Sequence, residues 1–360
     1  MQQRTQPTFD DQPIFVGLDV HKRHWHVSIR TADIHHKTFS QPPHAEPLVA
    51  YLHRIFPGAQ YTCVYEAGFC GFSVAHGLAA RGIECLVIHP PDLPRSERDR
   101  IYKSDPVDAR RLARELAAGH LQSIYIPERT ALEDRALVRM RQGFVHKQTR
   151  CKTQIRHQLS FYGIAVPETI EGTYWSRNFL AWLHALTLTT PSGTVAFQAL
   201  VTELEHLRLQ VGALTQHIRR RAREVPYAEA VHLLCTIPGI GVLTAMTVLT
   251  EIIDIGRFRT ADALASYAGL VPGVHASGDQ ERQTGLNKRR NAVLRHALIE
   301  SAWSAVQYDP VLLAWFTQAC MRRAKSQAIV GVARRLLNRI RYVLQTRQPY
   351  QVRAPQTSHA

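Results

Sequence analysis

The sequence predicts an α/β domain followed by mainly helical regions, and three observations support this. Up to about residue 125, short apolar runs alternate with helical patterns, as in a mixed sheet with helices outside. Two long helical patterns then cover 128–162 and 195–223, and shorter helical segments separated by Gly and Pro turns follow. We therefore expect an α/β domain at 14–125, a helical coiled-coil arm with an inserted loop at 126–230, a mainly helical domain at 231–345 and a disordered tail at 346–360.

The composition favours a nucleic-acid partner. The chain has 360 residues, with 44 Lys and Arg against 29 Asp and Glu, and this net charge of +15 suits a polyanion. The six cysteines show no metal-type spacing and are expected to be free thiols in a reducing compartment. No apolar run reaches the roughly 18 residues of a membrane span, and the polar start of the chain does not resemble a signal peptide. We expect a cytoplasmic protein without a membrane partner, associated with the nucleoid when bound to DNA.

The first domain is expected to follow the order β-β-β-α-β-α-β-α. The predicted strands are 14–20, 25–30, 36–40, 60–66 and 84–89, and the predicted helices are 46–55, 71–80 and one that begins at 105. Residues Trp25 to Arg30 alternate apolar and polar side chains, which is typical of a half-buried strand. Pro106 suits the first turn of a helix, because an N–H at that position would have no partner.

Four carboxylates lie at strand ends and at a helix start. Asp19 and Glu66 each end an apolar strand, where a charge is costly unless it is paired or bound to a cation. Asp105 and Asp108 are three residues apart, which places both on one face of the first helical turn. Helix capping is the alternative role for this second pair.

Clustered carboxylates repel one another and raise each other's pKa, and Mg²⁺ removes that cost because it takes oxygen ligands. Two such ions, about 4 Å apart, can bind the attacking and leaving oxygens at a phosphodiester. The alternative is that the four acids are unrelated and solvated.

The long helical patterns indicate an arm. Residues 128–162 contain no Pro and many basic side chains, and 195–223 carry Leu, Val and Ile at three- and four-residue spacing. Two such helices, joined by a loop-rich insert at 163–193, suggest an antiparallel coiled coil. A solvated basic helix is the alternative.

Near the start of the last domain, Pro238-Gly239-Ile240-Gly241 resembles a helix-hairpin-helix turn. In such a turn, Gly239 and Gly241 expose backbone N–H groups that can bind a phosphate oxygen at a helix N-terminus. An ordinary helix–helix turn is the alternative.

Several short motifs together resemble the DEDD-type transposases of the IS110/IS1111 insertion-sequence family. They are Gly17 to Lys22 (GLDVHK), Tyr65 to Gly68 (YEAG), Lys103 to Ala109 (KSDPVDA), and a later block from Ala261 to Leu298. The resemblance extends from Gly17 to about Trp303. It implies a bacterial enzyme with an RNase H-like, RuvC-like first domain, in which Asp19, Glu66, Asp105 and Asp108 bind Mg²⁺.

The same resemblance identifies Ser277 as the catalytic nucleophile, in the sequence His275-Ala276-Ser277-Gly278-Asp279. Without it, a serine in a Gly-containing loop is normally a turn residue. Basic residues around it can contact phosphate, as can two lysines beside the acidic motifs. These candidate nucleic-acid contacts are Lys22, Lys103, Arg282, Lys288, Arg289 and Arg295.

As the resemblance implies, the protein is a DNA transposase or recombinase that forms a phosphoserine intermediate. It would act as a homodimer or tetramer on donor and target DNA, with a structured guide RNA selecting the sites. A second hypothesis is a metal-dependent, resolvase-like nuclease that uses water and only the four acids. A third is a non-catalytic nucleic-acid-binding scaffold.

Overall fold

A computed structural model of the chain describes residues 9–93, 105–277, 280–286 and 290–352, with only the backbone described at 272–277 and 280–286. The chain divides into two compact units, Met1–Glu128 and Arg129–Ala360. The finer division predicted from the sequence stays a prediction, and most of the predicted tail lies outside the described residues.

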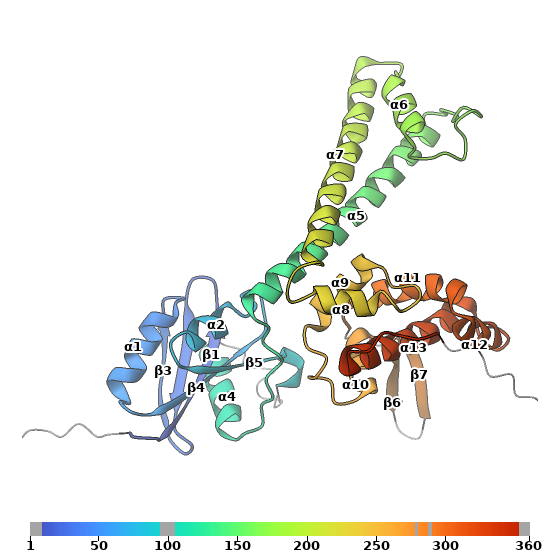
Figure 1. Ribbon diagram of the computed structural model, residues 1–360. Coiled ribbons are helices and arrows are strands. Elements are labelled where there is room, and N and C mark those ends of the chain that lie inside the picture. The colour runs from blue at the N-terminus through green and yellow to red at the C-terminus, as the bar shows by residue number, and fades with distance from the viewer. Residues whose placement is uncertain (1–8, 94–104, 278–279, 287–289, 353–360) are drawn as a thin grey trace, which may run out of the picture. The chain divides into compact units, whose positions relative to one another are not determined.

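The first unit contains a five-stranded mixed sheet with the strand order β3-β2-β1-β4-β5 (Figure 1). The strands are β1 (Pro13–Val20), β2 (Trp25–Arg30), β3 (His35–Gln41), β4 (Gln60–Glu66) and β5 (Glu84–Ile88). Strands β1 to β3 pair antiparallel, whereas β4 pairs parallel to both β1 and β5. The mixed sheet predicted from the apolar runs is therefore confirmed.

Helices cover both faces of this sheet, because alternate strand residues point to opposite sides. Helices α1 (Ala45–Ile55) and α2 (Ser73–Ala79) share a core with strand residues such as Leu18 and Tyr65. The neighbouring Val64 instead packs with Leu112 of α4 (Asp105–Ala117) on the other face. A short 3₁₀ helix, η1 (Pro90–Asp92), follows β5.

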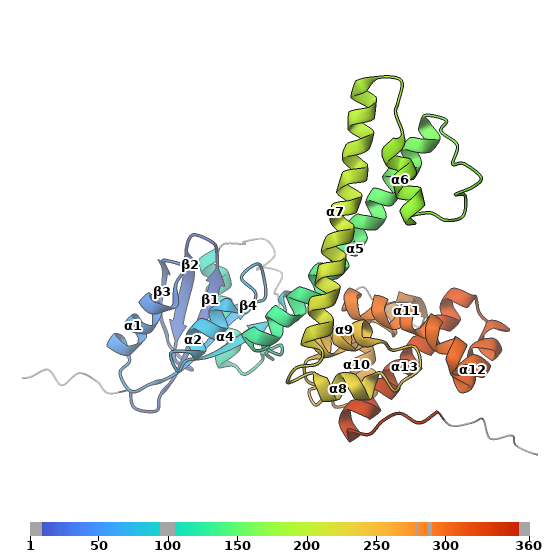
Figure 2. The same ribbon diagram turned by 45° about the horizontal axis from the view of Figure 1, so that its top comes forward.

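The second unit begins with an arm of two long helices, α5 (Arg129–Phe161) and α7 (Pro191–Arg221), which run side by side in both views (Figures 1 and 2). Their contacts have an antiparallel register. Arg141 donates to Thr215 Oγ1 at 2.8 Å, and further along α5 the Cys151 thiol lies 3.3 Å from the Leu200 carbonyl.

The insert at 163–193 was predicted to be loop-rich, but it contains helix α6 (Arg177–Ala185), and α7 begins at Pro191, earlier than predicted. Capping explains both helix starts. Ser176 accepts a hydrogen bond from the Phe179 N–H, and Thr190 accepts one from the Gly193 N–H. The α6 side chains Phe179 and Leu183 are fully buried against α5 and α7, so tertiary packing stabilises this short helix.

The rest of the second unit is mainly helical, as predicted. Its elements are α8 (Ala228–Leu234), α9 (Val242–Ile252), α10 (Ala261–Ala268), the strands β6 (Pro272–Ser277) and β7 (Gln280–Leu286), α11 (Ala292–Tyr308), α12 (Pro310–Cys320) and α13 (Lys325–Thr346). The helices share one apolar core, to which α13 contributes a stripe that includes Val332, Leu336 and Ile340. Within the described ranges, no helix combines the length and hydropathy required to cross a bilayer.

Candidate functional site

Helix α4 lies directly on β1 because Gly17 has no side chain. A Cβ at Gly17 would lie 2.1 Å from the Ala109 carbonyl oxygen and 2.5 Å from the Ala113 nitrogen. These are backbone atoms, so they cannot move aside without moving the helix. Gly17 therefore brings the start of α4 close to the end of β1, where Asp19 lies.

This close approach brings together Asp19, Asp105 and Asp108. Asp19 is partly buried, and burial together with the negative charges of Asp105 and Asp108 raises its pKa above the ordinary 3.8. The His21 ring opposes this shift, since its Nε2 lies 3.1 Å from an Asp19 oxygen and 3.4 Å from an Asp105 oxygen. The His21 contact therefore offsets only part of the rise in the pKa of Asp19.

Glu66 and Asp108 share a buried cation, Arg111. Leu18 pairs with Tyr65 in the parallel β1–β4 ladder, so Asp19 and Glu66 follow at the same end of adjacent strands. The Arg111 guanidinium is 5% exposed and lies 3.0 Å from Asp108 and 3.6 Å from Glu66. We call Asp19, Glu66, Asp105 and Asp108 the acidic cluster. Arg111 neutralises its Glu66 and Asp108 side from within the fold.

The remaining side of the cluster has the donor set of a cation site. Donor atoms of Asp19, His21 and Asp105 all lie within 4.8 Å of one another, and so do those of His24, His26 and Asp105. Two carboxylates flanked by imidazole nitrogens can hold a divalent metal ion. The residues present thus fit such an ion, with Asp105 common to both groups.

Ser277 is the last residue of β6, in a hairpin in which it pairs with Gln280 and in which His275 pairs with Arg282. Gly278, Asp279, Lys288, Arg289 and, in the first unit, Lys103 lie outside the described residues. The structure thus places the Ser277 and Arg282 backbones but not their side chains, so the nucleophile stays a prediction.

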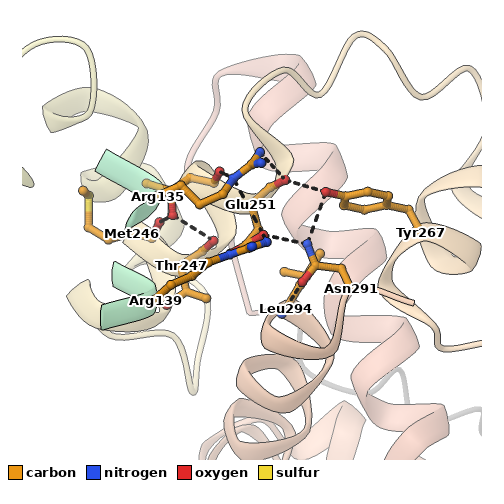
Figure 3. Close-up of polar contacts among 9 residues, drawn as sticks. Arg135, Arg139, Met246, Thr247, Glu251, Tyr267, Asn291 and Leu294 are labelled. Atoms are coloured by element: carbon orange, nitrogen blue, oxygen red, sulfur yellow. Dashed lines mark hydrogen bonds and ion pairs between the residues drawn. The ribbon is translucent and has the colours of Figure 1, made fainter. Parts of the chain in front are cut away.

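A buried glutamate contacts residues that precede and follow this hairpin in the sequence (Figure 3). Glu251 of α9 is fully buried and accepts two hydrogen bonds of 2.7 Å from Arg139 of the arm. Its carboxylate also accepts a 2.7 Å bond from the Asn291 side-chain amide, and its backbone carbonyl accepts one from the Tyr267 hydroxyl. Tyr267 precedes the hairpin and Asn291 follows it, so Glu251 connects the arm to both flanks of the segment that carries Ser277.

The pKa of Glu251 responds to these contacts. Burial alone would raise it, but the hydrogen bonds from Arg139 and Asn291 and the charges of Arg139 and Arg135 outweigh burial, so the pKa is lowered. Arg135 also donates to the Thr250 carbonyl at 2.8 Å. Glu251 is therefore ionised and internally neutralised, which is the arrangement of a structural ion pair.

The Gly239–Gly241 turn joins α8 and α9 as a helical hairpin. A Cβ at Gly239, whose φ is +86°, would lie 2.5 Å from the Ser301 carbonyl oxygen, so packing against α11 explains this glycine without a ligand. Gly241 is exposed at the start of α9 and lines a pocket of about 500 Å³ together with Arg219 and Arg223. Of the two glycines, only Gly241 is placed where a phosphate could approach.

Two other predicted contacts lie on described residues. Lys22 is exposed, with its ammonium 5.9 Å from the centre of the Phe69 ring. Arg295 lies on the first turns of α11, where burial and the nearby charge of Arg290 lower its pKa. Both positions are compatible with phosphate contact, and neither has geometry that requires it.

The ion pairs of the clustered and buried acids involve residues that the sequence motifs did not single out: His21, His26 and Arg111 beside the four acids, and the buried Glu251 with its arginine partners. Two of them had a usable signal. Arg111 is three residues after Asp108 on one helix, a spacing at which side chains meet. Glu251 is a lone acid near the end of an apolar helix, where a charge needs a partner.

Comparison with known proteins finds family models that match two separate stretches of the chain. The DEDD_Tnp_IS110 family model, described as a transposase, matches residues 16–164, and the model described as "Transposase IS116/IS110/IS902 family" matches residues 231–316. The first match contains the four acids and the second contains Ser277.

Similar proteins carry related names. Putative transposase y4qE of Sinorhizobium fredii is 30% identical over 69% of this chain and 59% of its own length. The transposase for insertion sequence element IS1111A of Coxiella burnetii is 28% identical over 64% of each chain. The pilin gene-inverting protein of Moraxella bovis is 30% identical over 42% of this chain and 46% of its own length. The chain thus spans less than two thirds of the length of the first two relatives.

Proposed function

Because the chain belongs to the IS110 family of DEDD transposases, we propose that it cleaves and exchanges DNA strands at the ends of an insertion sequence. The observation that carries this proposal is the cluster of Asp19, Asp105 and Asp108, which the Gly17 contact assembles from a strand and a helix. Three carboxylates held close together repel one another and so oppose folding, unless a bound cation offsets their charge. A gene-inverting relative is consistent with strand exchange rather than simple cutting.

Asp19 and Asp105 are the residues we assign to a divalent cation, with Asp108 and Glu66 completing the set. Such an ion, when bound, stabilises the charge that develops on a phosphodiester. The oxygen ligands of the four carboxylates, taken alone, favour Mg²⁺. Arg111 holds Glu66 and Asp108 in position through its guanidinium.

We assign the nucleophile to the hydroxyl oxygen of Ser277. Its attack forms a serine–phosphorus ester and breaks the phosphorus bond to the leaving deoxyribose oxygen, which takes up a proton. Return of a deoxyribose hydroxyl reverses these bonds and regenerates the serine. The basic residues of the same segment, Arg282, Lys288, Arg289 and Arg295, would contact the phosphate and offset its charge.

The partners follow from the family and from charge. A net charge of +15 suits DNA together with a structured guide RNA. Exposed basic residues on α5, among them Lys147, Arg150 and Arg156, offer the arm as the RNA-binding surface. A homodimer or tetramer would allow the acidic site of one chain to serve the serine of another.

The experiment that tests this proposal is to trap the covalent intermediate. A plasmid that carries the insertion sequence and its flanking DNA is recombined in cells, and the protein is isolated under denaturing conditions. We expect DNA linked to the wild-type protein and none linked to Ser277→Ala, which also loses strand exchange. Ser266→Ala, an exposed serine on α10, is the matched control and should behave as wild type.

Continued cleavage by Ser277→Ala without any adduct would favour the resolvase-like nuclease, in which water is the nucleophile. Full activity of Asp19→Asn would instead favour the non-catalytic scaffold.

Sequencing the RNA that co-purifies with the protein tests for the guide RNA. We expect one recurrent structured RNA, and the absence of any such RNA would favour the nuclease.

A further inference from the structure

Three histidines surround the Asp19–Asp105 side of the acidic cluster. In the antiparallel β1–β2 ladder, Asp19 lies directly opposite His26, so their side chains share one face of the sheet. The turn between the two strands contributes His21 and His24. The His21 and His24 rings are 5.5 Å apart, and those of His24 and His26 are 4.9 Å apart.

The ring nitrogens of two of these histidines point at the same carboxylate. Nε2 of His21 lies 3.4 Å from an Asp105 oxygen, and Nε2 of His26 lies 3.6 Å from the same oxygen. His26 is largely buried, with 17% of its side chain exposed. A cation held by Asp19 and Asp105 would therefore have imidazole nitrogens within reach as well as carboxylate oxygens.

Imidazole changes which metal ion the site favours. Mg²⁺ takes oxygen ligands almost exclusively and dehydrates reluctantly, whereas first-row transition metals accept both imidazole and carboxylate. Mn²⁺ is the member of that series most tolerant of carboxylate and water. The four acids favour Mg²⁺ only if the histidines are ignored.

The Glu66 and Asp108 side of the cluster differs from the Asp19 and Asp105 side, because it contains a permanent cation. Glu66 and Asp108 already contact the buried Arg111 guanidinium. Among the residues that the structure describes, the ion-pair partners found for Asp19 and Asp105 are histidines, and none is an arginine or a lysine.

We propose that His21 and His26 are metal ligands together with Asp19 and Asp105, and that the resident cation is a transition-metal ion of the Mn²⁺ type rather than Mg²⁺. This inference rests on the proposed function, because it takes for granted that the acidic cluster holds a divalent ion. It adds two nitrogen ligands to the carboxylate site and a preference for Mn²⁺ over Mg²⁺.

The test is electron paramagnetic resonance of Mn²⁺ added to the metal-free full-length protein. The loss of the free aqueous Mn²⁺ signal measures binding, and electron spin-echo modulation reports nitrogen bound directly to the ion. We expect nitrogen coupling in the wild type. In His21→Gln/His26→Gln, the coupling should disappear and Mn²⁺ affinity should fall about tenfold or more, as expected when groups that hold a metal are lost, with a smaller change for Mg²⁺.

His53→Gln is the matched control, since His53 is an exposed histidine of α1 in the same unit and outside the cluster. It should retain both coupling and affinity. Circular dichroism tests whether each variant is folded. If the double variant does not fold, the presence or absence of nitrogen coupling in the Mn²⁺ spectrum of the wild type still decides whether histidine binds the ion.

The outcomes separate the two proposals. Mn²⁺ binding that is lost in Asp19→Asn but shows no nitrogen coupling in the wild type would overturn the histidine ligands and leave the carboxylate site intact. In that case, the histidines would only position the carboxylates through the contacts seen here. If neither Mn²⁺ nor Mg²⁺ binds to the wild-type protein, the metal-dependent function itself fails.

Discussion

The two units each contain an acid in a costly position, and they neutralise it in opposite ways. Glu251 is fully buried, yet Arg139 and Asn291 hydrogen-bond its carboxylate and its pKa is lowered (Figure 3). Asp19 is less buried, yet burial and two neighbouring carboxylates raise its pKa. The degree of burial therefore does not distinguish the two sites; the balance of charge does.

This contrast teaches how to separate structural acids from functional ones. A carboxylate whose partners are all supplied by the fold stabilises that fold and has no binding capacity left. A carboxylate held near others of the same sign needs a cation from solution, which makes it a candidate for function.

The largest expected effect is on Glu251. Glu251→Ala leaves Arg135 and Arg139 without their shared carboxylate, and breaking a buried ion pair costs about 3–5 kcal/mol. Urea denaturation followed by circular dichroism should show this loss in free energy of unfolding. Glu229→Ala, an exposed glutamate on α8, should change the same quantity by less than about 0.5 kcal/mol. Equal effects of the two variants would mean that the Glu251 contacts add nothing to stability.

The next effect concerns the contact that assembles the acidic cluster. Gly17→Ala places a methyl group against the α4 backbone, so the helix must move; overpacking of this kind costs about 1–3 kcal/mol. Displacement of Asp105 and Asp108 from Asp19 should also weaken divalent-metal binding, measured by calorimetry.

The matched control for that variant is Gly212→Ala on α7, where an added Cβ meets no atom within 4 Å. It should leave metal binding unchanged and stabilise the helix by up to about 1 kcal/mol. Unaltered metal affinity in Gly17→Ala would show that the position of α4 does not set the acidic site.

The smallest effect is the pH dependence of stability, which should have opposite signs at the two sites. A raised pKa means that the folded state binds more protons than the unfolded chain. In metal-free protein, the Asp19 contribution to stability is therefore lost as pH rises from the ordinary 3.8 through the raised value. Glu251 has a lowered pKa, so its contribution is present above the ordinary 4.5 and is lost as pH falls through the lowered value.

Thermal melts across this pH range should resolve the two contributions. Asp19→Asn should remove the loss on the alkaline side, a change of about 1 kcal/mol or less, and Glu251→Gln should flatten the acid side. Asp33→Asn, at an exposed loop position, should alter neither. The same sign for both sites would contradict the comparison.

Local residue patterns were sufficient to predict the strands and helices of the sheet unit and to identify its exceptional acids. Apolar runs with a period of two define strands locally, and an acid at the end of such a run is conspicuous wherever it folds. Asp19 and Glu66 could thus be singled out without coordinates. The α6 helix could not, because its stability depends on burial of Phe179 and Leu183 against residues distant in the chain.

Which charges meet depends on how distant segments of the chain pack together. The contact of Gly17 with Ala109, the position of His26 opposite Asp19, and the pairing of Arg139 with Glu251 join residues from different elements. Electrostatic energy depends on distance through space and on burial, and neither quantity is encoded in local residue patterns. The sequence could therefore name the acids, whereas the fold decided which of them are neutralised by the protein and which still require a cation.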